Sequence, residues 1–582
     1  MDSLTISKIN TWLKGSYDLE TQNEIRRLQR EKPEELAESF YKNLEFGTGG
    51  MRGIMGVGTN RMNRYTIGMA TQGFANWLMR TYPDRQIKVA VAFDSRENSY
   101  FFANITADIL SANHIQCYIF SELRPTPELS FAVRELSCQG GIMITASHNP
   151  KEYNGYKVYG EDGGQLISPH DTDVIDEVNR ISDNEMIKWE RLEEYVTVLD
   201  DLESSDQAES IDQKYLTMIR SLSINPEKIQ RKSDLKIVFT PLHGTGITMV
   251  PPALAAFGFT NIHVVEEQAV PDGRFPTVSY PNPEDPAALR LAIDKALAIN
   301  GDLVLANDPD ADRVGAGFKD HGEKITLLNG NELAVLLTYY ILSELQKKKR
   351  LKSNNFIVKT IVTTDLLSEI ADDFHVPCYN VLTGFKYIAD IIRKNEGISH
   401  FVCGGEESYG FLIGDAVRDK DAVSTCCLIA ELTAMLALEN KNMKDLLYEI
   451  YQKYAFYKEE QVSLTKKGKD GLEEIVEMMR EYRQNPPAEI GGERVIMIHD
   501  YLSQLTKNIA DNTQKEIALP KSNVLQFVTE KGSLVTVRPS GTEPKIKFYI
   551  SVKSKEKNTC NDVVLKQLST NIKNIKKSLN IA

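Results

Sequence analysis

The pattern that most constrains the fold is a group of three apolar segments that occurs three times along the chain. The first segments are residues 88–94, 236–240 and 356–360, the second are 115–120, 262–265 and 376–381, and the third are 142–144, 303–305 and 401–403. Helix-like sequence follows the first segment of each group, which is typical of strands in βαβ units. Chance similarity among α/β segments is the alternative, but the same order in all three groups argues against it. We therefore expect an α/β protein with three related domains, whose sheets are mixed and mostly parallel.

The two ends of the chain differ from this repeated region. Residues 1 to about 45 have the mixed charged and apolar pattern of amphipathic helices. Near the C-terminus, a helix at about 472–482, strands at 533–537 and 546–552, and a final helix from about 562 indicate a small α+β domain. A chain of 582 residues suggests about four domains. We predict them at 1–210, 211–322, 323–455 and 456–582, with the acidic stretch 200–213 connecting the first two.

Charge and cysteine content exclude several classes of protein. The chain has 68 basic and 81 acidic residues, a net charge of −13, which argues against a general nucleic-acid surface. Its seven cysteines form no CxxC or Cys/His metal motif, which favours a reducing compartment. The N-terminus lacks a signal-peptide pattern, and the apolar segment 425–438 is too short to span a bilayer and contains Glu431. We expect a cytoplasmic protein, monomer or homodimer, without nucleic-acid or membrane partners.

A polar loop follows the third apolar segment of the first group. Its residues are Thr145-Ala146-Ser147-His148-Asn149-Pro150, and a loop at the carboxyl end of a strand is where open α/β sheets place their ligands. Ser147 is a candidate nucleophile, with His148 and Lys157 close in sequence. A polar turn after a core strand explains the local string equally well.

The corresponding loop of the second group contains three alternating carboxylates, Asp308, Asp310 and Asp312. Oxygen ligands at this density favour Mg²⁺ or Ca²⁺. An EF-hand would need Gly at its sixth position and Glu at its twelfth, where this chain has Arg313 and Lys319. A solvated acidic turn is the alternative, but the buried strand before the loop makes a metal site the better interpretation.

Two further loops carry polar groups suited to a sugar phosphate. The loop 404–410, Gly-Gly-Glu-Glu-Ser-Tyr-Gly, offers carboxylates for sugar hydroxyls, although an acidic helix N-terminus would look the same. The turn 538–545 sets Ser540 and Thr542 between two cations and suits a phosphate, although a Pro/Gly hairpin turn is the alternative. Arg52 lies in a glycine-rich segment, and Lys386 follows a glycine.

These features together indicate phosphoryl transfer between a substrate and the protein. The chain has no GxxxxGK[ST] motif, so nothing marks a nucleoside triphosphate site. A metal ion and arginine side chains would supply the neutralisation of phosphoryl oxygens that in-line transfer needs.

At these loops the sequence resembles the α-D-phosphohexomutase family, and most of all its long bacterial α-phosphoglucomutase type. The resemblance covers nearly the whole chain and rests on FGTGGMRG, TASHNPKEYNGYKVYG, FTPLHGTG, NDPDADR, TGFKYI, GGEESYG and RPSGTEPKIKFY, in this order. It implies four domains around a central cleft, which carry in turn the phosphoserine, metal-binding, sugar-binding and phosphate-binding loops.

The resemblance also implies a role for each candidate residue. Ser147 would carry a phosphoryl group, and Asp308, Asp310 and Asp312 would hold Mg²⁺, with the Ser147 phosphate as a further ligand. Glu406 and Ser408 would bind sugar hydroxyls. The phosphate at the other end of the sugar would be bound by Arg538, Ser540, Gly541 and Thr542. The charged or proton-transferring groups around the reacting phosphate would be Arg52, His148, Lys157, Arg313 and Lys386.

The implied reaction interconverts α-D-glucose 1-phosphate and glucose 6-phosphate through a phosphoserine enzyme and glucose 1,6-bisphosphate. Related enzymes that act on both glucose and mannose often have His where this chain has Tyr409, so glucose is favoured. Phosphomannomutase and phosphopentomutase activities remain alternatives within the family. A phosphatase with the same metal loop and a non-catalytic sugar-phosphate-binding protein are rivals from other classes.

Overall fold

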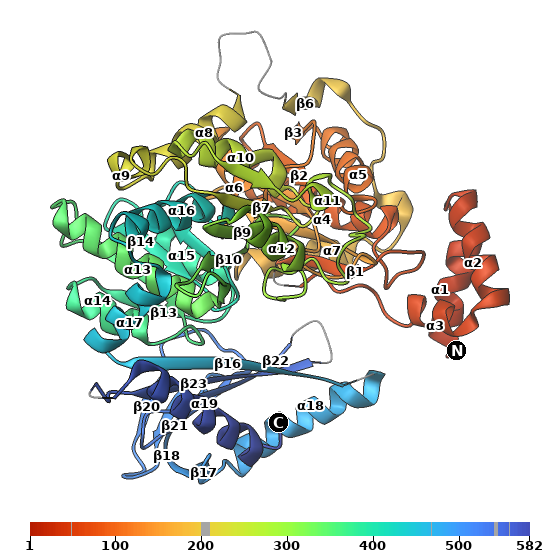
Figure 1. Cartoon of the computed structure of the whole chain (residues 1–582). Helices are drawn as coiled ribbons and strands as arrows, with labels where there is room; N and C mark the ends of the chain where they lie inside the picture. The colour runs from red at the N-terminus through yellow and green to blue at the C-terminus, as the bar shows by residue number, and fades with distance from the viewer. Residues whose placement is uncertain (48, 200–209, 467, 541–544, 558, 582) are drawn as a thin grey trace. The chain divides into compact units, whose positions relative to one another are not determined.

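The computed structural model describes residues 1–47, 49–199, 210–466, 468–540, 545–557 and 559–581, without the side chains of 468–470 and 472. Figure 1 shows the course of the chain and labels its helices and strands. The chain divides into two compact units. Unit 1 contains Met1–Gly330, Phe385–Cys403 and Ser408–Asn442, and unit 2 contains Asn331–Gly384, Gly404–Glu407 and Met443–Ala582.

The first sheet has six strands in the order β1-β5-β4-β2-β3-β6. Its strands are β1 (Gly50–Ile54), β2 (Lys88–Phe93), β3 (Gln116–Phe120), β4 (Gly140–Ile144), β5 (Tyr153–Gly160) and β6 (Val196–Leu199). β2 pairs parallel with β3 and β4, and β3 pairs parallel with β6, whereas β5 pairs antiparallel with β4 and β1. The helices along this part of the chain are α4 (Arg64–Thr81), α5 (Ser99–Ala112), α6 (Thr126–Glu135) and α7 (His170–Arg180).

Two adjacent glycines on β4 show how helices cover this sheet. A Cβ atom on Gly140 would lie 2.7 Å from the ring of Phe74 on α4, and one on Gly141 would lie 2.6 Å from Val133 on α6. Successive residues of a strand face opposite sides of the sheet. Helices α4 and α6 therefore cover opposite faces in an α/β/α arrangement, and only glycine fits between them at these two positions.

The second sheet has five strands in the order β11-β10-β9-β7-β8. They are β7 (Ile237–Thr240), β8 (Ile262–Val264), β9 (Leu303–Asn307), β10 (Val314–Lys319) and β11 (Ile325–Leu328). Helices α8 (Ile211–Ser221) and α9 (Pro226–Gln230) precede β7, and α10 (Gly246–Phe257), α11 (Glu266–Ala269) and α12 (Arg290–Ile299) lie between β7 and β9 in the chain. As in the first sheet, the first strand of the predicted group, here β7, is parallel to its two neighbours β8 and β9, and β10 turns back antiparallel beside β9.

The third sheet has the order β13-β12-β14-β15. Its elements are α13 (Gly330–Lys347), β12 (Asn355–Thr360), α14 (Leu366–Asp373), β13 (Cys378–Val381), α15 (Phe385–Asn395), β14 (His400–Gly405), β15 (Phe411–Ile413), α16 (Ala422–Leu438) and α17 (Met443–Lys453). In all three sheets the first strand of the predicted group lies between the second and the third, so the predicted repeat is confirmed.

The C-terminal sheet has the order β16-β23-β22-β21-β18-β19-β20, with β17 beside β18, and the pairings along it are antiparallel. Its strands are β16 (Phe456–Thr465), β17 (Glu489–Ile490), β18 (Glu493–Asp500), β19 (Leu505–Asn508), β20 (Gln514–Glu516), β21 (Leu525–Thr529), β22 (Leu534–Pro539) and β23 (Lys545–Ser554). Helices α18 (Gly468–Gln484) and α19 (Asn561–Ser578) complete the predicted α+β region.

Three short helices precede β1, as predicted: α1 (Ser3–Lys14), α2 (Leu19–Glu31) and α3 (Pro33–Phe40). Asp2 and Asp18 accept hydrogen bonds from the backbone N–H groups of Thr5 and Thr21 and so cap α1 and α2. The buried ring of Trp12 packs edge-on against Phe40 and Tyr65, with ring centroids 5.4 and 5.3 Å apart. These helices thus form a small aromatic core together with Tyr65 at the start of α4.

Within the described ranges, no individual helix has both the length and the apolar character of a membrane span. The bent pair α16 and α17 has them only when taken together, by length and composition. Helix α16 is buried over most of its length, as predicted for 425–438. Of the predicted connection 200–213, residues 200–209 lie outside the described ranges, and α8 begins directly after them, capped by Ser210.

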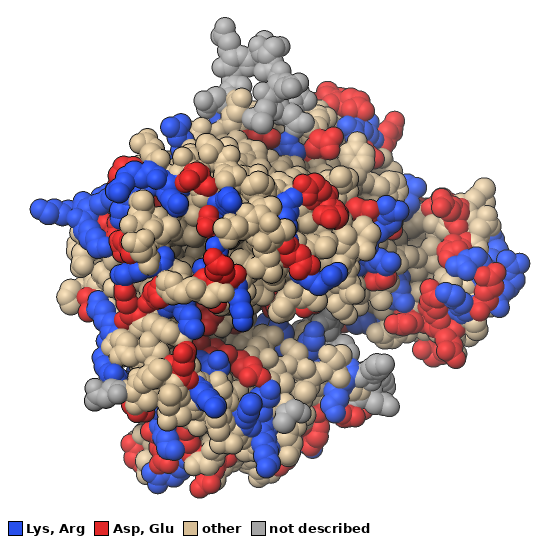
Figure 2. Space-filling model, in the orientation of Figure 1, with Lys and Arg blue, Asp and Glu red and all other residues tan. Residues whose placement is uncertain are grey.

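On the face shown in Figure 2, basic and acidic side chains are interspersed.

Candidate active site

Ser147 lies in the loop between β4 and β5 in a constrained backbone conformation. Its φ is +53°, a left-handed value that residues other than Gly, Asn and Asp seldom adopt, and its side chain is buried. The Ser147 N–H donates to Thr145 Oγ1 at 2.8 Å, and Thr145 Oγ1 donates to Asp94 Oδ2 at 2.6 Å. A chain of hydrogen bonds thus ties the loop to the end of β2.

The hydroxyl of Ser147 faces the aspartate loop that follows β9. Ser147 Oγ donates to Asp308 Oδ2 at 2.9 Å and accepts from Arg313 Nη1 at 2.5 Å. His148 Nδ1 lies 3.3 Å from the same oxygen and 2.6 Å from Arg313 Nη1. The structure therefore brings together the candidate nucleophile, one of the candidate metal ligands, an imidazole and a guanidinium.

The three carboxylates of the aspartate loop converge. Asp308, Asp310 and Asp312 are buried, and one ligand atom from each lies within 4.8 Å of the others. Thr126, at the start of α6, fixes Asp310, because its N–H donates to the Asp310 carbonyl at 2.9 Å and its hydroxyl to Oδ2 at 3.0 Å. The Oδ1 atoms of Asp310 and Asp312 accept no hydrogen bond within the described part of the chain.

Two lysines lie beside the carboxylates. Lys157 Nζ donates to Asp310 Oδ2 at 2.6 Å and to Asp312 Oδ2 at 3.3 Å. Lys420 Nζ lies 3.1 Å from Asp312 Oδ2 and 3.3 Å from Asp419 Oδ1. Burial tends to lower the pKa of Lys157, but Asp310 and Asp312 outweigh it and raise the pKa. Lys157 is therefore charged near neutral pH.

The electrostatics of the aspartate loop suit a hard divalent cation. Burial, and after it the carboxylates of Asp312 and Asp310, raise the pKa of Asp308 well above its ordinary value. Burial also opposes ionisation of Asp312, but nearby cations, of which Lys420 contributes most, hold its pKa well below the ordinary value. The buried Oδ1 atoms and the crowded negative charge match what Mg²⁺ requires of its ligands, so the donor set fits that ion.

Two other predicted cations, Arg52 and Lys386, have partners other than the aspartate loop. Arg52 lies on β1, and its Nη1 donates to Asn149 Oδ1 at 3.2 Å, beside the Ser147 loop. Lys386, at the start of α15, lies 3.8 Å from Asp171 Oδ2. Burial lowers the pKa of Lys386, and Asp171 counters this only in part. A buried lysine with a lowered pKa can exchange a proton near neutral pH more readily than an ordinary lysine.

Two side chains of this site, Arg96 and Lys420, were not predicted. Arg96 donates to backbone carbonyls of the Ser147 loop, and Lys420 reaches Asp312. The only sequence signals are the placement of Arg96 two residues after Asp94, at the end of β2, and of Lys420 in a charged run before α16. Neither signal specifies which partner the side chain meets.

The loop 404–410 is not helical, so it does not form the helix N-terminus considered as the alternative. Glu406, in unit 2, is buried, and its Oε1 accepts from the Gly384 N–H at 2.9 Å. Ser408 belongs to unit 1, where its carbonyl accepts from Arg313 Nε at 3.2 Å. Arg313 thus contacts both Ser147 and the backbone of this loop.

The predicted phosphate turn connects β22 and β23 in unit 2. Arg538 pairs with Lys547 across this antiparallel hairpin, and the Ser540 N–H donates to the Lys545 carbonyl at 2.7 Å. β22 and β23 therefore pair as a hairpin, whereas the turn residues 541–544 lie outside the described ranges. The predicted residues Gly541 and Thr542 lie outside the described ranges.

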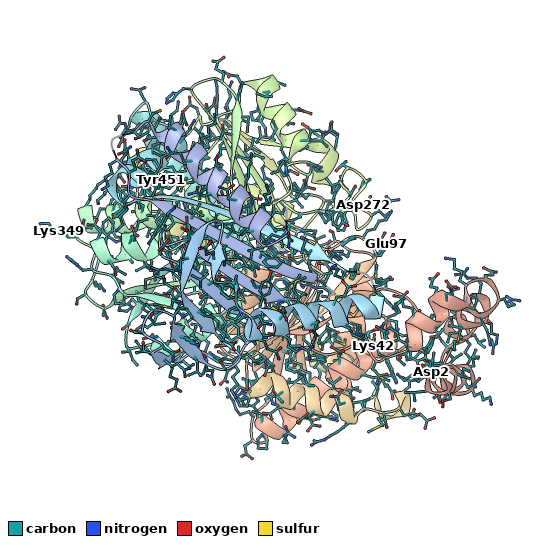
Figure 3. All side chains as sticks on the ribbon, turned by 90° about the horizontal axis from the view of Figure 1, so that it is seen from below. Asp2, Lys42, Glu97, Asp272, Lys349 and Tyr451 are labelled. Carbon is teal, nitrogen blue, oxygen red and sulfur yellow. The ribbon has the colours of Figure 1, made fainter. Side chains whose placement is uncertain are left out.

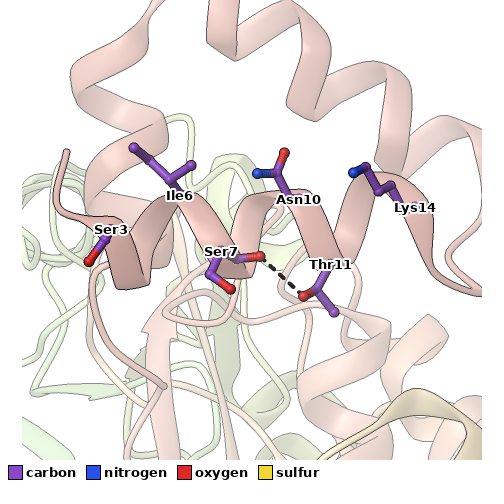
Figure 4. Close-up of a pocket in the computed structure, with 6 residues that line it drawn as sticks. All are labelled: Ser3, Ile6, Ser7, Asn10, Thr11 and Lys14. Atoms are coloured by element: carbon purple, nitrogen blue, oxygen red, sulfur yellow. Dashed lines mark hydrogen bonds between the residues drawn. The ribbon is translucent and has the colours of Figure 1, made fainter.

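A surface hollow of about 420 Å³ lies away from these residues, along α1. Figure 4 shows the side chains that line it, Ser3, Ile6, Ser7, Asn10, Thr11 and Lys14, all from one face of that helix. With a single cation and no converging carboxylates, it lacks the chemistry found around Ser147.

Comparisons with known proteins agree with this arrangement. Four models of the phosphoglucomutase/phosphomannomutase family match the chain in order: alpha/beta/alpha domain I at residues 43–185, alpha/beta/alpha domain II at 213–322, alpha/beta/alpha domain III at 329–454 and the C-terminal domain at 468–560. A phosphoglucomutase of Staphylococcus aureus (strain USA300) is 38% identical over 521 residues, covering 89% of this chain and 91% of that protein. A phosphoglucomutase of Staphylococcus haemolyticus (strain JCSC1435) is 36% identical over 515 residues, covering 88% and 91%.

Solved structures share the fold. A putative phosphomannomutase from Thermus thermophilus aligns with a TM-score of 0.65 at 20% identity, covering 93% of this chain and 99% of that one. The open form of the phosphoglucomutase pp63/parafusin from Paramecium aligns with a TM-score of 0.66 at 18% identity, covering 93% and 95%. With three α/β/α regions, an antiparallel C-terminal sheet and four matching family models, the chain belongs to the phosphoglucomutase/phosphomannomutase family, the α-D-phosphohexomutases.

Proposed function

We propose that the protein is a phosphoglucomutase, which interconverts α-D-glucose 1-phosphate and glucose 6-phosphate through a phosphorylated Ser147. The observation that carries the proposal is the set of contacts to Ser147 Oγ, which lies 2.9 Å from Asp308 and 2.5 Å from Arg313. A serine hydroxyl held between a carboxylate loop and a guanidinium suits covalent transfer of a phosphoryl group.

The reaction would have two transfers related by a turn of the sugar. In the first, the bond between Ser147 Oγ and phosphorus breaks while a bond from O6 of glucose 1-phosphate to phosphorus forms. The O6 proton leaves to a base, and Ser147 Oγ takes up a proton. In the second, Ser147 Oγ gives its proton to a base and bonds to the phosphorus on O1 of glucose 1,6-bisphosphate while the O1–phosphorus bond breaks. O1 takes up a proton, and glucose 6-phosphate remains. Neither water nor free phosphate is consumed.

Charged side chains would stabilise the transferring group. Arg313 already donates to Ser147 Oγ, and Lys157 lies among the carboxylates next to it. Asp308, Asp310 and Asp312 would hold Mg²⁺, with the phosphate on Ser147 as a further ligand. A bound cation of this kind would neutralise charge on the phosphoryl oxygens.

His148 and Lys386 are the proposed proton carriers. His148 Nδ1 lies 3.3 Å from Ser147 Oγ, within reach of a proton that leaves or returns to it. Burial lowers the pKa of Lys386, and a lowered pKa favours proton exchange. Arg52 is proposed to face the reacting phosphate from β1.

The sugar and the distant phosphate would be bound from other loops. Glu406 is proposed to accept hydrogen bonds from sugar hydroxyls, and Ser408 is proposed to donate a hydrogen bond to one. The phosphate that is not transferring would be bound by Arg538, Ser540, Gly541 and Thr542. On this proposal, the four domains predicted at 1–210, 211–322, 323–455 and 456–582 would each contribute one of these loops.

Glucose is the proposed sugar because relatives at 36–38% identity carry the name phosphoglucomutase and because Tyr409 occupies the position discussed above. A coupled assay should compare glucose, mannose, glucosamine and ribose 1-phosphates, each primed with its own bisphosphate. We expect the highest kcat/KM with glucose 1-phosphate and no appreciable release of inorganic phosphate. A preference for another sugar would assign a different mutase activity, and stoichiometric phosphate release would indicate a phosphatase.

A further inference from the structure

We propose that Arg96 is a positioning residue that holds the Ser147 loop in the conformation required for phosphoryl transfer. The inference rests on the proposed role of Ser147 as the phosphoryl carrier. Arg96 itself does not contact Ser147 Oγ through any hydrogen bond found within the described ranges. It acts on the backbone that carries the hydroxyl.

The guanidinium of Arg96 donates four hydrogen bonds to this backbone. Its Nη2 donates to the carbonyls of Ser147 and Asn149, at 2.6 and 2.5 Å. Its Nη1 donates to the carbonyls of Pro150 and Tyr153, at 2.8 and 3.0 Å. One planar group therefore fixes both ends of the segment from Ser147 to the start of β5.

The Nε of Arg96 is buried in the same scaffold, where it makes an ion pair but no hydrogen bond within the described ranges. Arg96 Nε lies 3.2 Å from Asp94 Oδ2, and both side chains are fully buried. Asp94 Oδ2 also accepts from Thr145, whose hydroxyl oxygen in turn accepts from the Ser147 N–H. The hydrogen bonds of Nη1 and Nη2 therefore go to the backbone of the loop, and the buried Nε lies beside Asp94.

A second segment holds Arg96 from its other side. The guanidinium lies over the ring of Phe275, 5.1 Å from its centroid. A Cβ atom on Gly273 would lie 2.3 Å from Glu97 N and 2.7 Å from the Arg96 backbone, so the two segments run in direct contact. Figure 3 labels their neighbours Glu97 and Asp272, which lie side by side. Arg96 thus has little freedom to move away from the loop.

The Ser147 loop requires these hydrogen bonds because its backbone conformation is intrinsically unfavourable. Ser147 has a φ of +53°, which persists only when surrounding contacts determine it. A lysine in place of Arg96 would keep the positive charge but would lack the planar fork that reaches several carbonyls at once. Displacement of the nucleophile by about 1 Å can reduce a reaction rate about 10²-fold.

The test compares Arg96→Lys with wild type in rapid-quench phosphorylation by glucose 1,6-bisphosphate, followed by mass spectrometry of the Ser147 peptide. Arg61→Lys is the matched control, since Arg61 is another buried arginine of unit 1 and donates to a backbone carbonyl, that of Asn60, at 3.1 Å. We expect Arg96→Lys to lower the maximal phosphorylation rate about 10²-fold. For Arg96→Lys, the bisphosphate concentration that gives half-maximal rate should change by less than about threefold. For Arg61→Lys, both the maximal rate and this concentration should stay within about twofold of wild type.

A fall in maximal rate without a change in half-saturation supports positioning if thermal unfolding shows an unchanged folded fraction. A general loss of structure would lower that fraction as well. A rate for Arg96→Lys within about threefold of wild type would overturn the inference.

If Arg96→Lys does not fold, Thr145→Val is the deciding variant. It removes the hydroxyl between Ser147 and Asp94, and we expect a maximal rate about 5–10-fold lower. An unchanged Thr145→Val rate would then overturn the inference. Wild-type protein that accepts no phosphoryl group would instead refute the proposed function.

Discussion

The two loops proposed to bind the phosphates of one substrate are built differently. The Ser147 loop is held by side chains from other strands of unit 1: Arg96 after β2 binds its carbonyls, and Asp308 and Arg313 after β9 bind its hydroxyl. The Arg538 turn belongs to a single hairpin of unit 2, where the Ser540 N–H donates to the Lys545 carbonyl and Arg538 is only partly buried.

The difference matches two physical demands. A transferring phosphoryl group needs its nucleophile fixed to a fraction of an ångström, so bonds from several strands converge on Ser147. The Arg538 turn, the anchoring turn, must bind a phosphate. In the proposed reaction it must also accept the sugar in two orientations. Charge-assisted hydrogen bonds from an arginine supply affinity for the phosphate in either orientation. Changes at the first loop should therefore reduce kcat, and changes at the second should raise KM.

The largest effect is expected from Ser147→Ala. Removal of the hydroxyl leaves no group to carry the phosphoryl, so we expect kcat to fall by about 10⁴-fold or more, as for other covalent nucleophiles. The coupled glucose 1-phosphate assay measures it, with a thermal unfolding curve as the control for folding. Near-normal turnover of a folded Ala variant would show that the phosphoryl group is not carried at Ser147.

The aspartate loop should give the next largest effect. Chelation should stop turnover and Mg²⁺ should restore it, and Asp310→Asn should lower kcat about 10²–10³-fold through lost charge stabilisation. Binding has its own readout: Mg²⁺ should raise the Tm of wild type more than that of Asp310→Asn, because a ligand stabilises the state that binds it. Turnover that is indifferent to chelator would exclude this loop as the metal site.

The anchoring turn should show the opposite kinetic signature. Arg538→Ala removes a charge-assisted hydrogen bond of about 1.5–3 kcal/mol, so we expect KM for glucose 1-phosphate to rise about 10–100-fold. The change in kcat should stay below about tenfold, in contrast to Arg96→Lys. An unchanged KM would show that Arg538 does not bind the distant phosphate, and the comparison between the two loops would fail.

The smallest effect concerns stability in the unit that carries the turn. Burial raises the pKa of Glu459 to about 7, helped by the Glu332 carboxylate and opposed by hydrogen bonds from Thr364 and Ser551. The unfolded carboxyl has a pKa of about 4.3. The folded state therefore holds the extra proton between these values, and the stabilisation from Glu459 is lost as pH rises through about 7.

Glu459→Gln removes this dependence because an amide does not ionise. We expect the Tm of Glu459→Gln to lie close to wild type near pH 5 and above it near pH 8, a difference of at most about 3 kcal/mol in unfolding free energy. Thermal unfolding of both proteins at the two pH values measures it. A Tm difference that does not change with pH would contradict the assignment.

The fold could be predicted because its strands are local patterns. All nine repeated strands occur within about two residues of their predicted positions, since a buried strand between helices needs an apolar run wherever it lies. The Asp308 loop was predicted for a similar reason, because its three ligands are close in sequence. The additional strands of these sheets were not predicted from these runs: β1, β5 and β6 in the first, β10 and β11 in the second and β15 in the third.

The scaffold of Ser147 could not be predicted in the same way. Arg96 and the carbonyl of Tyr153 are separated by 57 residues, and the carbonyl is a backbone group present at every position. Lys420 and Asp312 are 108 positions apart in the chain and meet only in the folded unit 1. Such contacts depend on tertiary structure, so a sequence pattern reveals the reacting side chains before it reveals what holds them.

The most direct test of the account is whether Ser147 carries a phosphoryl group. Protein incubated with glucose 1,6-bisphosphate and digested should yield a phosphopeptide that spans 140–157 with the phosphate on Ser147, and addition of glucose 1-phosphate should transfer it to the sugar. If that peptide stays unmodified, or if its phosphate is not passed to the sugar, Ser147 is not the phosphoryl carrier and the account is wrong.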